Sequence, residues 1–332
     1  MTTVQCLWTP SEKLKSFFED QLSGKTIKLI FPEKGKDNID LFPEIDKADI
    51  LLGWRITPEN LVKATQCKMM LVPGHGVKKN VDLFKALGID HKINLVNSHG
   101  NALATAQHTL AILFTLSNRT NFYHQLMKNG GWRPTDKTGP TTLIHHKTVG
   151  LLGYGAINKR VHQLMQGFDV NFKILKRTLS SDDTKNGFYN SEALHEFLEA
   201  VDILIIGIPL TQSTKGLIGK KELKLLGKSS MLVNVSRGSI IKQKALFNAL
   251  KKRQIAGAAI DVWYEYQPEP DKKGRKYPYK YPFHKLDNLV LSPHRGGSPL
   301  ENPYRFEDVI DNLIRFAEGR PLKNIINLER EY

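Results

Sequence analysis

The fold is decided by the stretch Val149-Gly150-Leu151-Leu152-Gly153-Tyr154-Gly155-Ala156-Ile157-Asn158. It begins as an apolar strand and continues, after the glycines, with helical spacing. Gly153 can form the tight turn between them, and Gly155 lets the backbone approach a pyrophosphate resting on the helix N-terminus. Asn158 stands where this pattern has glycine or alanine, so the match is imperfect, and a tight turn in a flavodoxin-like sheet is the alternative. The residues expected to contact a dinucleotide are Gly153, Tyr154, Gly155, Ala156 and Ile157.

Strand-like runs alternate with amphipathic runs on both sides of this turn. Such alternation predicts right-handed βαβ units and parallel sheets. In the larger series, the predicted strands are residues 148–152, 171–176, 202–208, 231–235, 258–262 and 289–292, and the helices are 156–166, 191–200, 220–226 and 244–252. A weaker series before it has strands at 27–31, 50–52, 69–72 and 93–96. A long helix is predicted at 102–117, and a tail helix at 307–317 could pack back on the first domain.

The composition narrows the class of protein. The chain has 332 residues, 40% hydrophobic and 24% charged, which is ordinary for a globular protein of two domains. Its net charge of +15 indicates either an anionic partner or a solvated lysine-rich surface. Because the lysines are scattered and no nucleic-acid motif occurs, nucleic-acid binding is disfavoured.

The cysteines and the apolar runs indicate the cellular compartment in which the protein resides. Cys6 and Cys67 match no disulfide framework and no metal spacing, residues 1–10 do not resemble a signal peptide, and no apolar run is long enough to span a membrane. We therefore expect a soluble, cytoplasmic protein with no metal site and no membrane partner.

The second predicted strand bears on the choice of cofactor. An NAD-preferring site places an acid about 20 residues after the glycines, to accept from the ribose hydroxyls. Here Lys176 stands 23 residues after Gly153, followed by Arg177 and Thr178. Two cations and a hydroxyl suit the additional 2′-phosphate of NADP, so NADP is the preferred cofactor and NAD the second possibility. The alternative is a pair of exposed basic residues at a strand end.

Several further motifs occur in a fixed order along nearly the whole chain. They are Pro73-Gly74-His75-Gly76-Val77, residues 101–109 (Asn-Ala-Leu-Ala-Thr-Ala-Gln-His-Thr), Gly131-Trp132, residues 209–218 (Pro-Leu-Thr-Gln-Ser-Thr-Lys-Gly-Leu-Ile), Asn234-Val235-Ser236-Arg237-Gly238, residues 258–263 (Ala-Ala-Ile-Asp-Val-Trp) and Ser292-Pro293-His294. Together with the glycine loop, this ordered set resembles the D-isomer-specific 2-hydroxyacid dehydrogenases.

The resemblance implies an α/β fold of two Rossmann- or flavodoxin-like domains with parallel sheets and a cleft between them. The substrate domain would be discontinuous, residues 1–98 plus 295–332, and the dinucleotide-binding domain would be residues 99–294. It also implies a homodimer held partly by the long helix at 102–117.

The resemblance assigns roles to individual residues. Arg237 would bind the substrate carboxylate and polarise its carbonyl, and His294 would donate the proton. His75, Gly76 and Trp54 are the other candidate substrate-binding residues. The alternative is that His75 is an ordinary loop histidine and Trp54 an ordinary surface residue, with no part in substrate binding. The other expected cofactor contacts are Ile208, Pro209, Thr214, Val235, Ser236, Asp261 and Gly296.

One departure from the family pattern concerns the partner of His294. The family places a glutamate five residues after the aspartate, but here that position is Tyr266, with Glu265 beside it and Glu269 later. Either the carboxylate has moved or His294 works with a tyrosine, so Tyr266 and Glu265 join the catalytic candidates. Without a nearby anion, the pKa of His294 should be lower. The insertion at 271–281 is either a flexible surface loop or a basic, aromatic lid over an anionic substrate.

These residues predict hydride transfer between NAD(P)H and a small 2-keto acid or D-2-hydroxy acid, as in a glyoxylate or hydroxypyruvate reductase. The partner would be a small anionic 2-keto or 2-hydroxy acid. One alternative is a formate-dehydrogenase-like oxidation, which needs no acid–base proton. The other is a dinucleotide-binding regulator with weak or no catalysis.

Overall fold

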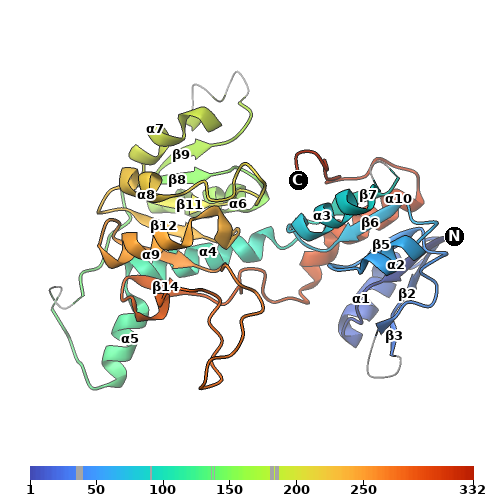
Figure 1. Ribbon diagram of the computed structural model, residues 1–332, viewed down its shortest axis with the longest axis horizontal. Coiled ribbons are helices and arrows are strands. Elements are labelled where there is room, and N and C mark those ends of the chain that lie inside the picture. Colours follow the sequence, from blue (N-terminus) through green and yellow to red (C-terminus); the bar gives the residue numbers. More distant parts are fainter. Residues whose placement is uncertain (35–39, 90–91, 136, 138, 180–182, 184–186) are drawn as a thin grey trace. The chain divides into compact units, whose positions relative to one another are not determined.

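A computed structural model describes residues 1–34, 40–89, 92–135, 137, 139–179, 183 and 187–332. The chain forms two compact units, drawn in Figure 1. Unit 1 comprises Met1–Asn101 and Ser298–Tyr332, and unit 2 is the continuous stretch Ala102–Gly297. Both boundaries fall three residues later than the sequence-based expectation.

Unit 1 is built on a five-stranded parallel sheet. The strand order is β2(Ile27–Ile30), β1(Thr2–Cys6), β5(Ile50–Leu52), β6(Met69–Val72) and β7(Asn94–Asn97), and a small antiparallel pair, β3(Glu33–Lys34) and β4(Asp40–Leu41), lies apart from it. The helices are α1(Glu12–Leu22), α2(Pro58–Lys63), α3(Lys78–Leu87) and α10(Glu307–Ala317). Helix α1 begins where the hydroxyl of Ser11 accepts from the amide of Leu14, which satisfies one of the free N–H groups of its first turn.

The tail helix α10 completes the core of unit 1. Its buried residues Val309, Ile310 and Leu313 belong to the same apolar cluster as Val4 of β1 and Phe18 of α1. The prediction that the tail packs on the first domain is therefore confirmed.

Unit 2 is built on a seven-stranded parallel sheet. The strand order is β10(Phe188–Tyr189), β9(Asn171–Leu175), β8(Thr148–Leu152), β11(Ile203–Ile206), β12(Met231–Asn234), β13(Gly257–Ile260) and β14(Leu289–Leu291). The helices are α4(Ala102–Ser117), α5(Thr120–Lys128), α6(Ala156–Met165), α7(Leu194–Glu199), α8(Lys220–Leu226) and α9(Gln243–Lys251). The strand order reverses direction at β8, and in open α/β sheets a crevice for ligands opens at such a point.

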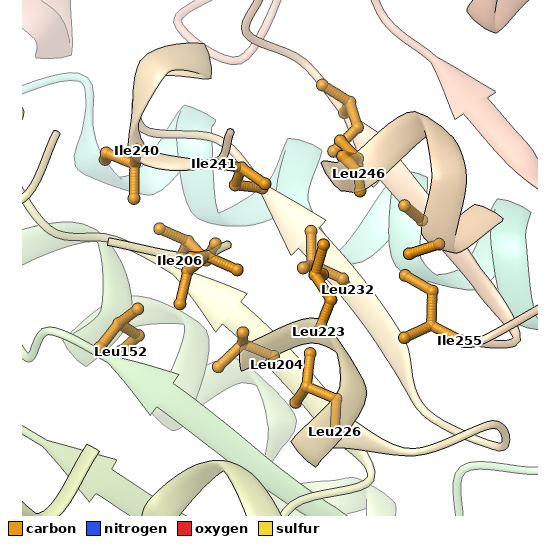
Figure 2. Packing of buried hydrophobic residues seen from close by; sticks show 14 of the residues in the cluster. Leu152, Leu204, Ile206, Leu223, Leu226, Leu232, Ile240, Ile241, Leu246 and Ile255 are labelled. Atoms are coloured by element: carbon orange, nitrogen blue, oxygen red, sulfur yellow. The ribbon is translucent and has the colours of Figure 1, made fainter. Parts of the chain in front are cut away.

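Both faces of this sheet are covered, because alternate residues of one strand enter different cores. Leu204 and Ile206 of β11 belong to one apolar cluster, while Ile203 and Ile205 belong to the other. Figure 2 shows the first cluster, where strand residues such as Leu232 face Leu223 of α8. This explains why β11 is an uninterrupted apolar run instead of an alternating one.

Several element bounds agree with the sequence-based prediction, namely 50–52, 69–72, 102–117, 148–152, 220–226 and 307–317. Other predictions were wrong in detail. The strand predicted at 202–208 ends at Ile206, ahead of Pro209, which has no N–H to donate. The helix predicted at 191–200 begins as a 3₁₀ turn, Ser191–Ala193, because Asn190 caps the amides of Glu192 and Ala193. Strands β1, β3, β4 and β10 and helices α1 and α5 were missed. Within the described residues, every helix is too short or too polar to span a bilayer.

Candidate active site

The glycine loop joins β8 to α6 and provides an open cradle. Gly153 has φ +87°, and its amide donates to the carbonyl of Leu175 at 2.8 Å. A Cβ on Gly153 would lie 2.6 Å from Cγ2 of Ile208, so a side chain is excluded there on two counts. A Cβ on Gly155 would meet nothing within 4 Å, which leaves the space beside the N-terminus of α6 open to a ligand.

Asn158 occupies the third position of the glycine pattern in an unexpected way. It is fully buried, and its Nδ2 donates to the carbonyls of Gly153 at 2.7 Å, Leu152 at 3.4 Å and Ile205 at 3.5 Å. A Cβ on Gly207 would lie 2.6 Å from that nitrogen. Gly207, just after β11, therefore leaves the space that the side chain of Asn158 occupies. The amide of Asn158 in turn links the glycine turn to the ends of β8 and β11.

The residues expected to select the cofactor lie where β9 ends. Nζ of Lys176 forms an ion pair with Oδ2 of Asp183 at 2.7 Å and lies 5.0 Å from the ring centroid of Phe188. Arg177 and Thr178 are exposed. Because Leu175 pairs with Leu152 and bonds Gly153, this cationic group lies directly beside the glycine loop.

The loops after β11 and β12 are fastened to each other at the same edge of the sheet. The hydroxyl of Ser236, after β12, donates to the carbonyl of Ile208, after β11, and within the loop after β11 the hydroxyl of Thr214 donates to the carbonyl of Pro209 at 2.6 Å. Val235 is buried beside them. These expected cofactor contacts lie beside the glycine loop, because Ile208 also faces Gly153.

Asp261 follows β13 and is almost completely buried, with 1% of its surface exposed. Its carboxylate accepts from the amide of Arg295 at 2.7 Å, the amide of Gly296 at 2.9 Å and the hydroxyl of Ser292 at 2.5 Å. Burial alone would raise its pKa, but these bonds and one from His108 lower the pKa below its ordinary value. Asp261 therefore holds, as a carboxylate, the backbone that follows His294.

His294 lies on a strained turn. Its φ is +57°, a left-handed conformation that is uncommon for a residue with a side chain. The ring of Tyr266 lies edge-on to its imidazole, with the ring centroids 5.4 Å apart. Burial among its neighbours and the positive charge of Arg237 lower the pKa of His294 below 6.5, and the opposing influence of Asp261 is smaller.

Arg237 begins the short helix Gly238–Ile240 that follows β12. Its Nη1 donates to the carbonyl of Ser236 at 2.7 Å, and the side-chain amide of Asn234 donates to the carbonyl of Arg237 at 3.1 Å. Its charge acts on the pKa values of both His294 and Tyr266. The structure thus brings Arg237, His294 and Tyr266 together within unit 2.

Glu265 lies elsewhere. It is exposed, and its carboxylate accepts from the amide of Gln267 at 3.0 Å. The side chain that neighbours His294 is Tyr266, the next residue.

The insertion at 271–281 packs against the preceding segment of unit 2. The carbonyl of Pro278 accepts from the amides of Tyr264 at 3.2 Å and Glu265 at 3.0 Å. The ring of Tyr279 lies 4.9 Å from Trp263, centroid to centroid. The lysines of this segment, Lys272, Lys273, Lys276 and Lys280, are exposed. The insertion therefore braces the chain next to Tyr266 with its aromatic residues and presents its charges to solvent.

In unit 1, the residues expected to bind substrate surround the loop after β6. Nε1 of Trp54 donates to the carbonyl of Pro73 at 3.0 Å, and the ring of His75 stacks on His99 with centroids 4.7 Å apart. Gly76 is exposed.

The sequence analysis did not identify Arg305, whose side chain holds the loop after β6 by hydrogen bonds to the carbonyl of Pro73. It is buried, and its guanidinium donates to the carbonyl of Pro73 from Nη2 at 3.2 Å and from Nε at 3.4 Å. It also lies over the ring of Trp54, 5.6 Å from the centroid. No local motif marks Arg305, because its partners are more than 200 residues away in sequence.

Comparison with known proteins identifies the family. Residues 110–296 match the model described as "D-isomer specific 2-hydroxyacid dehydrogenase, NAD binding domain". The chain belongs to this family. Its members are oxidoreductases that act on CH–OH donors with NAD(P). In the part of the chain that the structure describes, no cluster of three or more His, Cys, Asp or Glu side chains could hold a metal ion.

Among relatives within the family, the chain is similar to a glyoxylate reductase of Aeropyrum pernix, with 32% identity over 86% of this chain and 84% of that protein. It is also 30% identical to a D-3-phosphoglycerate dehydrogenase of Bacillus subtilis over 88% of its length, but it spans only 54% of that relative.

A solved structure shares the fold of this family member. It is a D-isomer specific 2-hydroxyacid dehydrogenase from Xanthobacter autotrophicus Py2 in complex with NADPH and MES, with a TM-score of 0.80 and 20% identity. The match covers 100% of this chain and 99% of that one, and it confirms the predicted α/β fold with parallel sheets.

Proposed function

We propose that this family member is an NADPH-preferring reductase of small 2-keto acids, producing D-2-hydroxy acids. The observation that carries the proposal is the grouping of Arg237, His294 and Tyr266 around the turn that Asp261 holds, in the unit that also carries the glycine loop. The similarity to glyoxylate reductases supports a small keto acid as substrate.

Each side chain has a chemical task in this reaction. Arg237 offers a planar fork of N–H donors that can bind the substrate carboxylate and polarise the carbonyl. His294, as an imidazolium, gives its proton to the carbonyl oxygen when the hydride reaches the carbonyl carbon, leaving a hydroxyl and a neutral imidazole. Tyr266 lies edge-on to the imidazole and covers part of it. When bound, the nicotinamide supplies the hydride.

The geometry of unit 2 fits a dinucleotide. The space beside Gly155 admits a pyrophosphate, and the fastened loops that carry Ile208, Pro209, Thr214, Val235 and Ser236 would form the floor under the cofactor. Asp261 and Gly296 would lie at the nicotinamide end. Lys176, Arg177 and Thr178 stand where an NAD-preferring site has an acid, so they support a preference for NADP.

From unit 1 we propose His75, Gly76 and Trp54 as substrate-binding residues. The support is the fixed conformation of their loop, in which the carbonyl of Pro73 accepts from both Trp54 and Arg305. A rigid loop can present its amides to a carboxylate at little entropic cost.

We further propose a homodimer in the cytoplasm. Helix α5 lies apart from the sheet of unit 2 (Figure 1), and none of its side chains is fully buried. Met127 of this helix and Trp132 shortly after it are 56% and 74% exposed, and Leu143 in the segment that follows is 76% exposed. A second copy of the chain would cover these apolar side chains. The two buried, free cysteines suit a reducing compartment.

A second candidate function is oxidation of formate, favoured by the tyrosine at position 266. That reaction releases the C–H hydrogen of formate as hydride and leaves CO₂, so no acid–base group is required. Tyr266 in place of a carboxylate would not impair it.

The deciding experiment measures NADPH and NADH oxidation with glyoxylate, hydroxypyruvate and pyruvate, and NAD⁺ or NADP⁺ reduction with formate. We expect keto-acid reduction with NADPH, lost by at least about 100-fold in His294→Ala and in Arg237→Ala. Arg253→Ala, which breaks an exposed ion pair with Asp287, is the control and should keep full activity.

Other results would overturn the proposal. Formate oxidation that persists in His294→Ala would favour the second candidate. Tight NADPH binding without turnover of any of these acids would favour a regulator.

A further inference from the structure

Three side chains from separate elements of unit 2 meet beneath the turn that carries His294. They are His108 of α4, Asp261 after β13 and Ser292 after β14. Nε2 of His108 lies 2.9 Å from Oγ of Ser292 and 3.2 Å from Oδ1 of Asp261, and Oγ of Ser292 lies 2.5 Å from the same carboxylate oxygen. The sequence marked His108 only as part of a family helix and gave it no role.

The direction of these bonds can be worked out from the groups themselves. A carboxylate only accepts, so the single hydroxyl proton of Ser292 goes to Asp261. The oxygen of Ser292 must then accept from His108. Nε2 of His108 therefore carries a proton, which points at both Ser292 and Asp261.

The carboxylate of Asp261 also binds the backbone of the turn after His294. Oδ1 accepts from the amide of Arg295, and Oδ2 accepts from the amide of Gly296. A Cβ on Gly296 would lie 2.9 Å from Oδ2, so the backbone and the carboxylate are in close contact. His294 precedes these two residues and has a left-handed conformation. The amides of the two residues after it, Arg295 and Gly296, both bind the carboxylate of Asp261, so the orientation of that carboxylate determines the conformation of the turn.

We propose that His108 is a positioning residue for His294. Its Nε2–H fixes the carboxylate of Asp261, directly and through Ser292, and so fixes the turn that presents the imidazole to the substrate carbonyl. This inference rests on the proposed function, in which His294 donates the proton. The partners in the chain are buried, with Ser292 and Asp261 at 6% and 1% exposure, so water does not replace a lost bond easily.

The test compares two substitutions at His108. His108→Gln keeps an N–H donor near the position of Nε2, whereas His108→Phe keeps a ring and removes the donor. With NADPH and the best keto acid, we expect kcat to fall about tenfold in His108→Phe, because a displaced proton donor slows the chemical step. The KM for NADPH should change less than kcat, and His108→Gln should recover most of the lost kcat.

A second measurement needs no turnover. Hydrogen–deuterium exchange of the free protein reports the amides of Arg295 and Gly296, which should exchange faster in His108→Phe than in the wild type or in His108→Gln. The matched control is His195→Phe, which breaks another histidine–carboxylate pair of unit 2, His195 with Glu222 at 3.0 Å. That control should change neither kcat nor exchange at the turn.

The outcomes separate this inference from the proposed function. An active wild type with unchanged kcat and exchange in His108→Phe would overturn the inference and leave the function standing. Equal losses in His108→Phe and His108→Gln would overturn it too, because keeping an N–H donor at position 108 would then bring no benefit. An inactive wild type would refute the proposed function, and faster exchange in His108→Phe alone would still support the hold of His108 on the turn.

Discussion

The ring of Tyr266 lies edge-on to the imidazole of His294, with 5.4 Å between the ring centroids. Tyr266 stands where the family pattern has a carboxylate, and the neighbouring Glu265 turns its side chain to the amide of Gln267. The imidazole therefore lies against the edge of an aromatic ring, and its partial desolvation together with the charge of Arg237 disfavours its protonated form.

The first prediction concerns the pH dependence of the reductase. Burial and Arg237 lower the pKa of His294 below 6.5, and reduction requires the protonated imidazole. The value of kcat/KM, which reports the free enzyme, should therefore fall as the pH rises, with an apparent pKa below 6.5. Steady-state rates measured from pH 4.5 to about pH 9 would show this limb. A limb centred above pH 7 would contradict it.

The second prediction places a carboxylate beside the imidazole. In Tyr266→Glu, the new negative charge should favour the imidazolium and move the limb of the pH profile upward by about one unit or more. Tyr266→Phe keeps the ring contact and adds no charge, so it should leave the limb in place. The same rate measurements decide, and an unmoved limb in Tyr266→Glu would show that position 266 does not face His294 in the active enzyme.

The third prediction uses the ion pair at the end of β9. Asp183 neutralises part of the charge of Lys176, at 2.7 Å. Lys176→Ala should weaken NADPH binding about tenfold with little effect on NADH, as expected for one charge-assisted hydrogen bond to phosphate. Asp183→Asn should tighten NADPH binding. Fluorescence titration gives both dissociation constants, and Lys173→Ala on the same strand is the control. Equal effects on both cofactors would refute the assignment.

The fourth prediction tests how Asn158 and Gly207 share one space. Asn158→Ala leaves buried carbonyls without their donor and should lower the free energy of unfolding by about 2 kcal/mol. Gly207→Ala should also destabilise, because its Cβ would lie 2.6 Å from Nδ2 of Asn158. In the double variant, the second change should be far less harmful than it is alone. Urea unfolding measures all four proteins, and additive losses would exclude the steric coupling.

The fifth prediction addresses the proposed homodimer. Trp132→Glu combined with Leu143→Glu should convert the dimer into a monomer, because each charge would be buried in the interface. Light scattering after size-exclusion chromatography gives the mass directly. Val62→Glu changes an apolar residue of unit 1 that is 62% exposed and should leave the mass unchanged. A wild type that is monomeric at micromolar concentration would rule out the dimer.

The sequence predicts best those elements whose structure is determined by residues that are close together in the chain. The run Ile203–Ile206 is apolar throughout because it is buried on both faces, and the turn after β8 needs its glycine at φ +87°. Both signals are local, so both can be recognised from neighbouring residues alone.

The elements that were missed depend on distant partners. Strand β1 contains Gln5, which looks exposed in the sequence but is fully buried. Its amide donates to the carbonyl of Ile30, a residue of the adjacent strand, at 3.2 Å. Arg305 and His108 are similar cases, since the groups they bind, Pro73 and Asp261, lie far away along the chain. A polar residue gives no local sign of whether such a partner exists.

The two units differ in when their cores can be completed. Unit 2 is one unbroken stretch of chain, whereas unit 1 requires Val309, Ile310 and Leu313 to close over Val4 and Phe18. During synthesis, the ribosome therefore releases every residue of unit 2 before unit 1 has its last helix. Until then, the first hundred residues expose an apolar sheet face, and a chain stalled before Glu307 would present that face to chaperones and proteases while unit 2 is already able to fold.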